Sequence, residues 1–297
     1  MSLIKKIALF GKGNVGSAAL EHLLKAGFQV TVFGRSKHEV PLGATFVQVD
    51  YSLDTLSEAL KGHDAIVSTV GPAAVLTQKT IIDAAIIAGV RRFVPSEFSS
   101  VNTDPKARDV PTFQLFIEVQ DYLKAKAEAG DIEFTIFATG PFLEYVFGSP
   151  LFIDLEHRAV QLHDKGDVRI SATSIAGIGK AIAGGLQKPD QTKNRVVHVH
   201  ETVISQLKLL DLAKKAFPEV ELNITTVNSL DALDAATVKF VQDPTDLIAA
   251  FQLIKAVMVS GKYYTEYLEL DNELVGLPTL SDVDLEKDWV PLMAKKK

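Results

Sequence analysis

The chain of 297 residues contains no cysteine, one tryptophan and only three methionines. Without cysteine it can form no disulfide, thiolate metal site or cysteine nucleophile. It also lacks any run of about 18 apolar residues, the length that spans a bilayer, and the lysines at positions 5 and 6 precede no signal-peptide segment. A cytoplasmic location is therefore expected, without membrane attachment.

A strong excess of charge of one sign is missing as well. The chain has 31 Lys and Arg against 37 Asp and Glu, a formal net charge of −6. A mildly acidic chain whose basic residues are scattered is not expected to bind nucleic acid or anionic lipid. Hydrophobic residues make up 47% of it, which is enough for a sizeable globular core.

The first half of the chain alternates short β-rich runs with helical segments, a pattern typical of a doubly wound parallel α/β sheet. One run, Ala65-Ile66-Val67, is apolar without alternation, as in strands that are covered on both faces. The predicted strands are Lys6–Phe10, Gln29–Phe33, Thr45–Val49, Ala65–Thr69, Arg92–Pro95 and Glu133–Ala138, and the helices include Val15–Ala26, Val75–Ala88 and Phe113–Ala129.

The pattern loosens after Gly140 and predicts a smaller C-terminal α/β lobe. We expect residues 1–145 with about 171–200 to form the nucleotide-binding domain, and about 146–170 with 201–297 to form the substrate lobe. The predicted elements are a hairpin over Ala159–Ser171 with its turn at residues 164–167, helices at Ile175–Leu186, Val203–Ala216, Ser229–Val241 and Pro244–Val259, and strands at Arg195–Val199, which is expected to rejoin the main sheet, and near Glu221–Val227.

A glycine-rich turn follows the first predicted strand and opens the first helix. It comprises Gly11, Lys12, Gly13, Asn14, Val15 and Gly16, a GxGxxG spacing. The first glycine permits the tight turn, the second lets the backbone approach a diphosphate, and the third lets helix and strand pack closely. The N–H groups and dipole at the helix start favour the phosphates. This context predicts a Rossmann-type dinucleotide site.

The residues after the second strand distinguish between the two nicotinamide dinucleotides. NAD enzymes usually carry Asp or Glu here for the ribose hydroxyls. This chain has Arg35, Ser36 and Lys37 instead, and a guanidinium pairs with a 2′-phosphate that a carboxylate would repel. The sequence therefore predicts NADP(H).

Residues at the ends of the third and fourth strands are expected to line the same groove, since ligands bind outside the carboxyl ends of parallel strands. These are Asp50, Thr69, Val70 and Gly71. For Asp50 and for Ser68, helix capping is an equal alternative to a ligand contact.

With these motifs, the chain resembles the NmrA-like, isoflavone reductase-like branch of the atypical short-chain dehydrogenases. The resemblance rests on GKGNVG, FGRS, VSTVGP, the RFVPSEF run at residues 92–98 and the later FTIFATGPFLEY, and it covers Leu3 to Tyr145 well. It implies NADPH as cofactor and reduction of an aromatic small molecule. Further cofactor contacts are expected at Pro95, Ser96 and Phe142, and the substrate pocket is expected to include Glu97, Phe98, Leu143, Tyr145 and His163.

The catalytic lysine of the plant reductases is missing from its expected position. Counting back from Ile132 places Gln120 there, and an amide cannot act as a titratable acid or base near neutral pH. Lys124, one turn along the same helical face, is the alternative. Tyr122 and Lys126 match a YxxxK spacing, but Tyr122 lies roughly 200° around the helix from position 120, so it is expected to face away.

The leading interpretation is an NADPH-dependent reductase of an aromatic or polyketide-like small molecule, acting as a monomer or homodimer. Because of Gln120, a non-catalytic NADP(H)-binding redox sensor stays open, as does a redox-neutral isomerase or cyclase. His198 and His200 share a strand face, but no third ligand is spaced nearby and no metal is expected.

Overall fold

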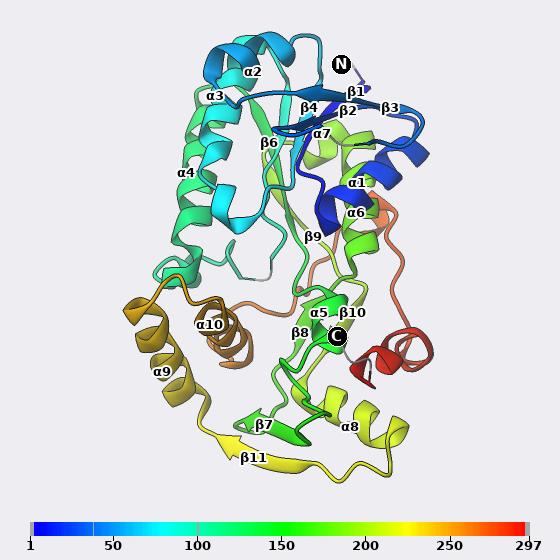
Figure 1. The fold of residues 1–297 in the computed structure, drawn as a ribbon, viewed down its shortest axis with the longest axis vertical. Coiled ribbons are helices and arrows are strands. Elements are labelled where there is room, and N and C mark those ends of the chain that lie inside the picture. The colour runs from blue at the N-terminus through cyan, green and yellow to red at the C-terminus, as the bar shows by residue number, and fades with distance from the viewer. Residues whose placement is uncertain (1–2, 38, 100, 295–297) are drawn as a thin grey trace.

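The computed structural model describes residues 3–37, 39–99 and 101–294. Its centre is a seven-stranded parallel sheet in the order β3-β2-β1-β4-β5-β6-β9, in the upper half of Figure 1. The predicted doubly wound sheet is thus confirmed, and the strand at residue 195 does rejoin it. The strands are β1 (Lys6–Phe10), β2 (Gln29–Gly34), β3 (Ala44–Gln48), β4 (Ala65–Ser68), β5 (Arg92–Val94), β6 (Glu133–Ala138) and β9 (Arg195–His198).

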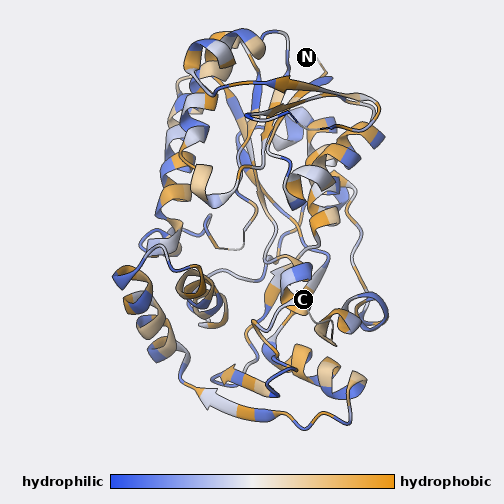
Figure 2. Cartoon of the chain, in the orientation of Figure 1, coloured by the Kyte–Doolittle hydropathy of each residue, from blue (hydrophilic) through white to orange (hydrophobic). Residues whose placement is uncertain are grey.

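Helices cover both faces of this sheet, and the alternation of side chains along each strand explains why both faces are apolar. On β1, Ile7 and Leu9 belong to the core under α1 (Asn14–Lys25) and α6 (Ile175–Gln187). Ala8 and Phe10 belong to the opposite core, under α2 (Leu53–Ala59), α3 (Thr77–Ala88) and α4 (Gln114–Glu128). Apolar and polar residues alternate along these helices (Figure 2).

The lower part of the molecule has its own small sheets and helices (Figure 1). β7 (Ala159–His163) pairs in parallel with β11 (Asn223–Val227), and β8 (Ile170–Ala172) pairs antiparallel with β10 (Thr202–Ile204). The helices here are α5 (Leu143–Gly148), α8 (Gln206–Ala216), α9 (Ser229–Gln242), α10 (Leu247–Val259) and the short α12 (Asp282–Asp284). The short α7 (Pro189–Thr192) and α11 (Asn272–Val275) lie beside the main sheet, next to β9 and α6. Short 3-10 segments lie at Pro72–Ala74, Pro105–Ala107, Pro111–Phe113 and Val290–Ala294, and a π turn lies at Leu285–Trp289.

The predicted hairpin over residues 159–171 is wrong, because β7 and β8 pair with different partners. The turn that follows β7 instead binds the segment that joins β11 to α9. The Asp164 carboxylate accepts hydrogen bonds from the Ser229 amide and hydroxyl, at 3.1 and 2.5 Å, and the Asp164 amide donates to the Val227 carbonyl. These contacts bring β11 and the start of α9 beside β7.

Two predicted helix starts are also too early. Residues 202–204 extend into β10, and α8 begins only after Ser205, whose hydroxyl accepts from the Lys208 amide. Asp246 caps α10 in the same way, so that helix begins at Leu247 rather than at Pro244. In both cases a side-chain cap sets the boundary. None of the helices in the described residues has the length and hydropathy needed to cross a bilayer.

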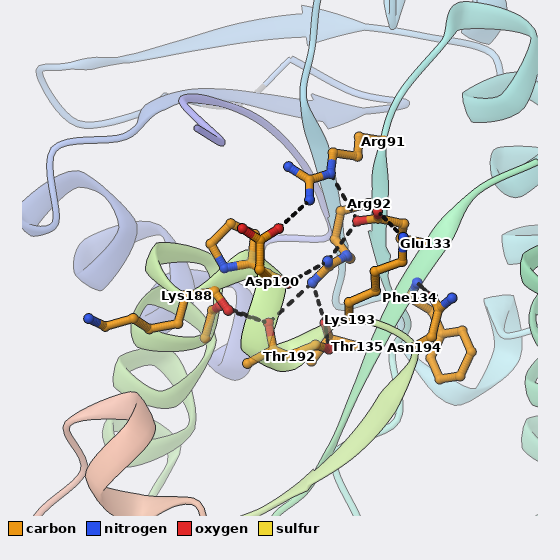
Figure 3. A network of polar contacts seen from close by, with 12 residues as sticks. Arg91, Arg92, Glu133, Phe134, Thr135, Lys188, Asp190, Thr192, Lys193 and Asn194 are labelled. Carbon is orange, nitrogen blue, oxygen red and sulfur yellow. Dashed lines mark hydrogen bonds and ion pairs between the residues drawn. The ribbon is translucent and has the colours of Figure 1, made fainter. Parts of the chain in front are cut away.

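The first residue of the RFVPSEF run, Arg92, is buried and links neighbouring strands of the sheet through hydrogen bonds (Figure 3). Its guanidinium donates to the Glu133 carboxylate at 2.7 Å, to the Thr135 and Thr192 hydroxyls at 2.8 and 3.2 Å, and to the Pro189 carbonyl at 2.8 Å. These partners lie on β6 and on the α7 segment that leads into β9. Arg92 therefore ties together the three strands at one side of the sheet.

Candidate cofactor and substrate site

The glycine turn between β1 and α1 has no room for a side chain at two of its glycines and open space at the third. At Gly11, where φ is +91°, a Cβ would lie 2.6 Å from the Thr69 carbonyl oxygen, and at Gly16 it would lie 2.2 Å from the Gly11 carbonyl oxygen. At Gly13 no atom lies within 4 Å of such a Cβ. Gly13 is also the N-cap of α1 and offers no side-chain cap, so the first amides of α1 are left for another acceptor.

Side chains at the ends of β4 and β5 hold the neighbouring loops in place. The Thr69 hydroxyl donates to the carbonyls of Phe10 and Gly11, at 2.9 and 3.0 Å. The Ser96 hydroxyl donates to the Val70 carbonyl at 2.8 Å, and its amide donates to the Gln78 side chain. The hydroxyls of Thr69 and Ser96 thus organise the edge of the groove, and Gly71 is open on its Cβ side.

The basic turn after β2 is exposed to solvent at Arg35, Ser36 and Lys37. The Gln48 amide donates to the Arg35 carbonyl at 2.9 Å, which anchors the backbone and leaves the guanidinium outward. The Lys12 ammonium donates to the Glu39 carbonyl and so links the glycine turn to the segment that follows the basic turn.

Asp50, which is expected either to meet the cofactor or to cap a helix, contacts the residue that caps α2. Its carboxylate accepts from the Ser52 amide at 2.9 Å and hydroxyl at 2.7 Å, and these bonds lower its pKa. Ser52 in turn caps α2. The exposed carboxylate remains beside the groove.

Tyr145, on α5, joins the cofactor turn to the lower part of the molecule. Its hydroxyl lies 3.4 Å from the Asn14 amide nitrogen, and its ring stacks on Phe142 with centroids 5.8 Å apart. It lines a cavity of 760 Å³ with residues of α1 and also a second cavity of 1030 Å³ below it. Phe98 and Phe142 are partly buried against the α1–α6 core.

The 1030 Å³ cavity lies between α5, β7, β11, α9 and α10. His163, expected in the pocket, lines it, whereas Leu143 is fully buried in the lobe core beside Phe147 and is not part of its wall. Lys255 also lines it and was missed, although it is the only charged residue in the apolar run of α10. The full lining is Tyr145, Ser149, Pro150, Leu151, Gln161, His163, Val227, Asn228, Asp231, Ala232, Ala235, Ala236, Lys239, Ile248, Phe251, Gln252, Lys255 and Ala256.

Gln120, at the position of the family's lysine, belongs to a buried polar cluster with Glu97, Asn102 and Lys124. Gln120 is 2% exposed and Glu97 is 3% exposed. The Asn102 amide donates to Glu97 at 2.6 Å, Gln120 donates to the Asn102 carbonyl at 3.2 Å, and the Lys124 ammonium donates to Gln120 at 3.5 Å. Burial raises the pKa of Glu97 to about 7, although hydrogen bonds from Gln120 and Asn102 oppose the shift. A carboxyl that is half protonated near neutral pH is suited to proton transfer.

Tyr122 faces away from this cluster, as the helical spacing predicts. Its hydroxyl donates to Asp83 on α3 at 2.5 Å. Desolvation and this contact raise the pKa of Tyr122 to about 12, which is the opposite of what a YxxxK tyrosine needs.

The two histidines of β9 and its following loop are engaged separately. His198 packs against the rings of Tyr264 and Tyr267, and His200 Nδ1 lies 2.8 Å from the Ser171 hydroxyl. Within the described residues there is no cluster of three or more potential metal ligands.

Comparisons with known proteins agree with this architecture. A family described as NAD(P)H-binding matches residues 11–176. The oxidoreductase aprR of Aspergillus flavus is 33% identical over 289 residues, which cover 93% of this chain and 95% of that protein. A phenylcoumaran benzylic ether reductase of Pyrus communis, Pyrc5, is 32% identical over 149 residues, 46% of this chain and 48% of that protein.

Solved structures share the fold. Isoflavone reductase superposes with a TM-score of 0.76 at 20% identity, covering 94% of this chain and 97% of that one. The leucoanthocyanidin reductase–NADPH complex of Vitis vinifera gives 0.73 at 19% identity, covering 98% and 100%. The NAD(P)H-binding family match and the similarity to an oxidoreductase over nearly the whole chain place this protein among the NAD(P)H-dependent oxidoreductases. The chain belongs to the NmrA-like, isoflavone reductase-like family of NAD(P)H-binding proteins.

Proposed function

We propose that this protein uses NADPH to reduce an aromatic or polyketide-like small molecule that binds in the 1030 Å³ cavity. The observation that carries the proposal is the position of Tyr145, which contacts the start of α1 through Asn14 and also lines the large cavity. A cofactor on α1 and a substrate in the cavity would therefore meet at one side chain. The phenylcoumaran benzylic ether reductase and isoflavone reductase relatives support an aromatic substrate.

The residues present fit the cofactor. Gly13 leaves open space at an uncapped helix start, and the turn at residues 35–37 offers two cations and no carboxylate. We assign the diphosphate to the glycine turn and the 2′-phosphate to Arg35. The further proposed contacts are Lys12, Asn14, Val15, Ser36, Lys37, Asp50, Thr69, Val70, Gly71, Pro95, Ser96 and Phe142.

When bound, NADPH supplies a hydride. The chain must orient the substrate, exclude water and supply a proton. We assign the proton to the cluster in which Glu97 is held by Asn102 and Gln120, with Lys124 one contact further out. Gln120 then acts as a polar clamp where the plant enzymes have lysine. Tyr145 contributes an aromatic wall of the cavity, whereas Phe98 does not line it and packs against the α1–α6 core instead.

The remaining assignments concern the whole molecule. We propose that residues 1–145 with about 171–200 form the NADP-binding domain and that the rest forms the substrate lobe. We also propose that the protein is cytoplasmic and acts as a monomer or homodimer.

Calorimetric titration of the wild type and of Arg35→Ala with NADPH and with NADH tests the cofactor site. A bidentate, charge-assisted phosphate contact contributes about 1.5–3 kcal/mol, so Arg35→Ala should weaken NADPH about 10- to 100-fold and NADH little. Arg35→Lys, which keeps the charge without the fork, should lie between them. Equal losses for both nucleotides would show that Arg35 does not contact the 2′-phosphate.

Turnover is tested by following the absorbance of NADPH with a panel of phenols, quinones and enones. Oxidation with any of them supports the reductase. Because position 120 is glutamine, a redox sensor is the second candidate. Tight NADPH binding without oxidation across the panel would favour it.

A further inference from the structure

One lysine lines the large cavity without a polar partner among the residues that the structure describes. Lys255 is partly buried on α10, and among the described residues no hydrogen bond or ion pair to its ammonium is found. Its only specific contact is with the Phe152 ring, whose centroid lies 6.0 Å away. Lys239, on the α9 side of the same cavity, is by contrast exposed and donates to Gln252 at 2.9 Å.

Such an ammonium is costly, because removing a charge from water is unfavourable unless an opposite charge or good hydrogen bonds replace the solvent. Burial lowers the pKa of Lys255, and no carboxylate in the described part of the chain offsets this effect. Asp231, the acidic residue among the cavity lining, is exposed. The chain therefore leaves an uncompensated positive charge on the cavity wall.

His163, on β7, lines the same cavity and carries a buried polar atom without a partner. It is 4% exposed, and its buried Nδ1 has no hydrogen-bond partner. Burial and then the charge of Lys255 lower its pKa, while hydrogen bonds with Gln206 and Gln161 act in the opposite direction. His163 and Lys255 both line this cavity, from β7 and from α10.

The rest of the wall is largely apolar. It includes Leu151, Val227, Ala236, Ile248 and Phe251. Ile248 and Phe251 are 65% and 53% exposed, an unusual exposure that an apolar ligand in the cavity would reduce. A ligand that satisfies the whole cavity is thus apolar over most of its surface and negatively charged at one end.

We propose that Lys255 and His163 form an anion-binding subsite, and that the substrate is an aromatic or similarly apolar molecule bearing one anionic oxygen, from a carboxylate or an ionised phenol or enol. The inference rests on the proposed function in taking the cavity as the substrate site. It concerns binding alone and can be tested without turnover.

The test is fluorescence titration with two probes of nearly the same aromatic body, anilinonaphthalenesulfonate, which is anionic, and phenylnaphthylamine, which is neutral. Lys255→Met should weaken the anionic probe at least about tenfold and change the neutral probe less than about twofold. His163→Leu should weaken the anionic probe in the same selective way. Lys239→Met, the matched control, removes an identical charge from the rim and should change neither probe beyond about twofold.

Lys255→Arg, which keeps the charge, should retain the anionic probe, and Lys255→Gln replaces the methionine variant should that variant fail to fold. Competition by naphthoic acid and by naphthol then distinguishes a carboxylate from a phenol. Wild-type protein that does not bind the anionic probe, equal losses of both probes, or an equal effect of Lys239→Met would overturn the subsite. The rise in melting temperature with NADPH, measured on every variant, reports the proposed function separately.

Discussion

In the buried network around Arg92, removal of Arg92 and removal of Glu133 are expected to destabilise the protein by different amounts. Glu133 accepts from Arg92 but also pairs with Arg91 at 3.0 Å and with Lys193 at 2.8 Å (Figure 3). Arg92 is fully buried, and Glu133 is the carboxylate that contacts it. Removing the arginine therefore leaves the glutamate with two cations, whereas removing the glutamate leaves the arginine with neutral acceptors only.

The expected magnitudes follow from these contacts. Glu133→Ala strands a buried guanidinium beside the like charge of Arg91 and should lower the free energy of unfolding by about 3–5 kcal/mol. Arg92→Met fills much of the volume with apolar atoms. It costs mainly the hydrogen bond to the Pro189 carbonyl, about 1–3 kcal/mol. The Thr135 and Thr192 hydroxyls keep their backbone acceptors.

Urea unfolding at 25 °C followed by circular dichroism measures both changes. Glu133→Gln, which keeps the acceptor and loses the charge, is the control and should fall between the two. The reasoning is refuted if Arg92→Met destabilises the protein as much as Glu133→Ala does. The contacts of the arginine would then stabilise the folded state by more than the burial of its charge costs.

Three further predictions concern the site. Tyr122→Phe should leave turnover within about twofold, because its hydroxyl contacts Asp83 rather than the groove; a fall of about three orders of magnitude in kcat would show that it is a catalytic acid. The folded pKa of Glu97, about 7, lies above its ordinary 4.5. Between these values the folded state keeps a proton that the unfolded state has lost, so stability should fall as pH rises through this window, by up to ~3 kcal/mol. Urea unfolding of Glu97→Gln at pH 5 and pH 8 should show this slope removed, and an unchanged slope would contradict the assignment. Gly16→Ala should lower the melting temperature because its Cβ has no room, whereas Gly13→Ala should keep the melting temperature and weaken NADPH binding; the reverse order would show that the two glycines were misassigned.

A glutamine at position 120, where the family resemblance leads one to expect lysine, affects the protonation of the neighbouring Glu97. Without a lysine at this point, Glu97 keeps a raised pKa near neutrality, and Lys124 reaches Gln120 from the next turn. An ammonium at position 120 would pair with Glu97 and lower that pKa. The glutamine thus leaves the carboxyl available to hold a proton.

The parallel sheet, the glycine turn and the choice of NADP(H) could be predicted from the order of the amino acids alone. These features depend on neighbours along the chain: the period of apolar residues, the spacing of Gly11, Gly13 and Gly16, and the charge of Arg35 directly after its strand. The orientation of Tyr122 away from the site could be predicted for the same reason, because helical geometry relates it to Gln120 two residues earlier.

Contacts between residues far apart in the chain could not be predicted in this way. The turn after β7 looked like that of a hairpin, but Asp164 binds Ser229 and brings in a strand from much later in the chain. Leu143 was indistinguishable from a pocket residue until its burial in the lobe core was known, and nothing local relates Lys255 to His163. Pairing and burial at such separations depend on how whole helices and strands pack. The residues adjacent in sequence to Asp164, Leu143, Lys255 or His163 do not indicate that packing.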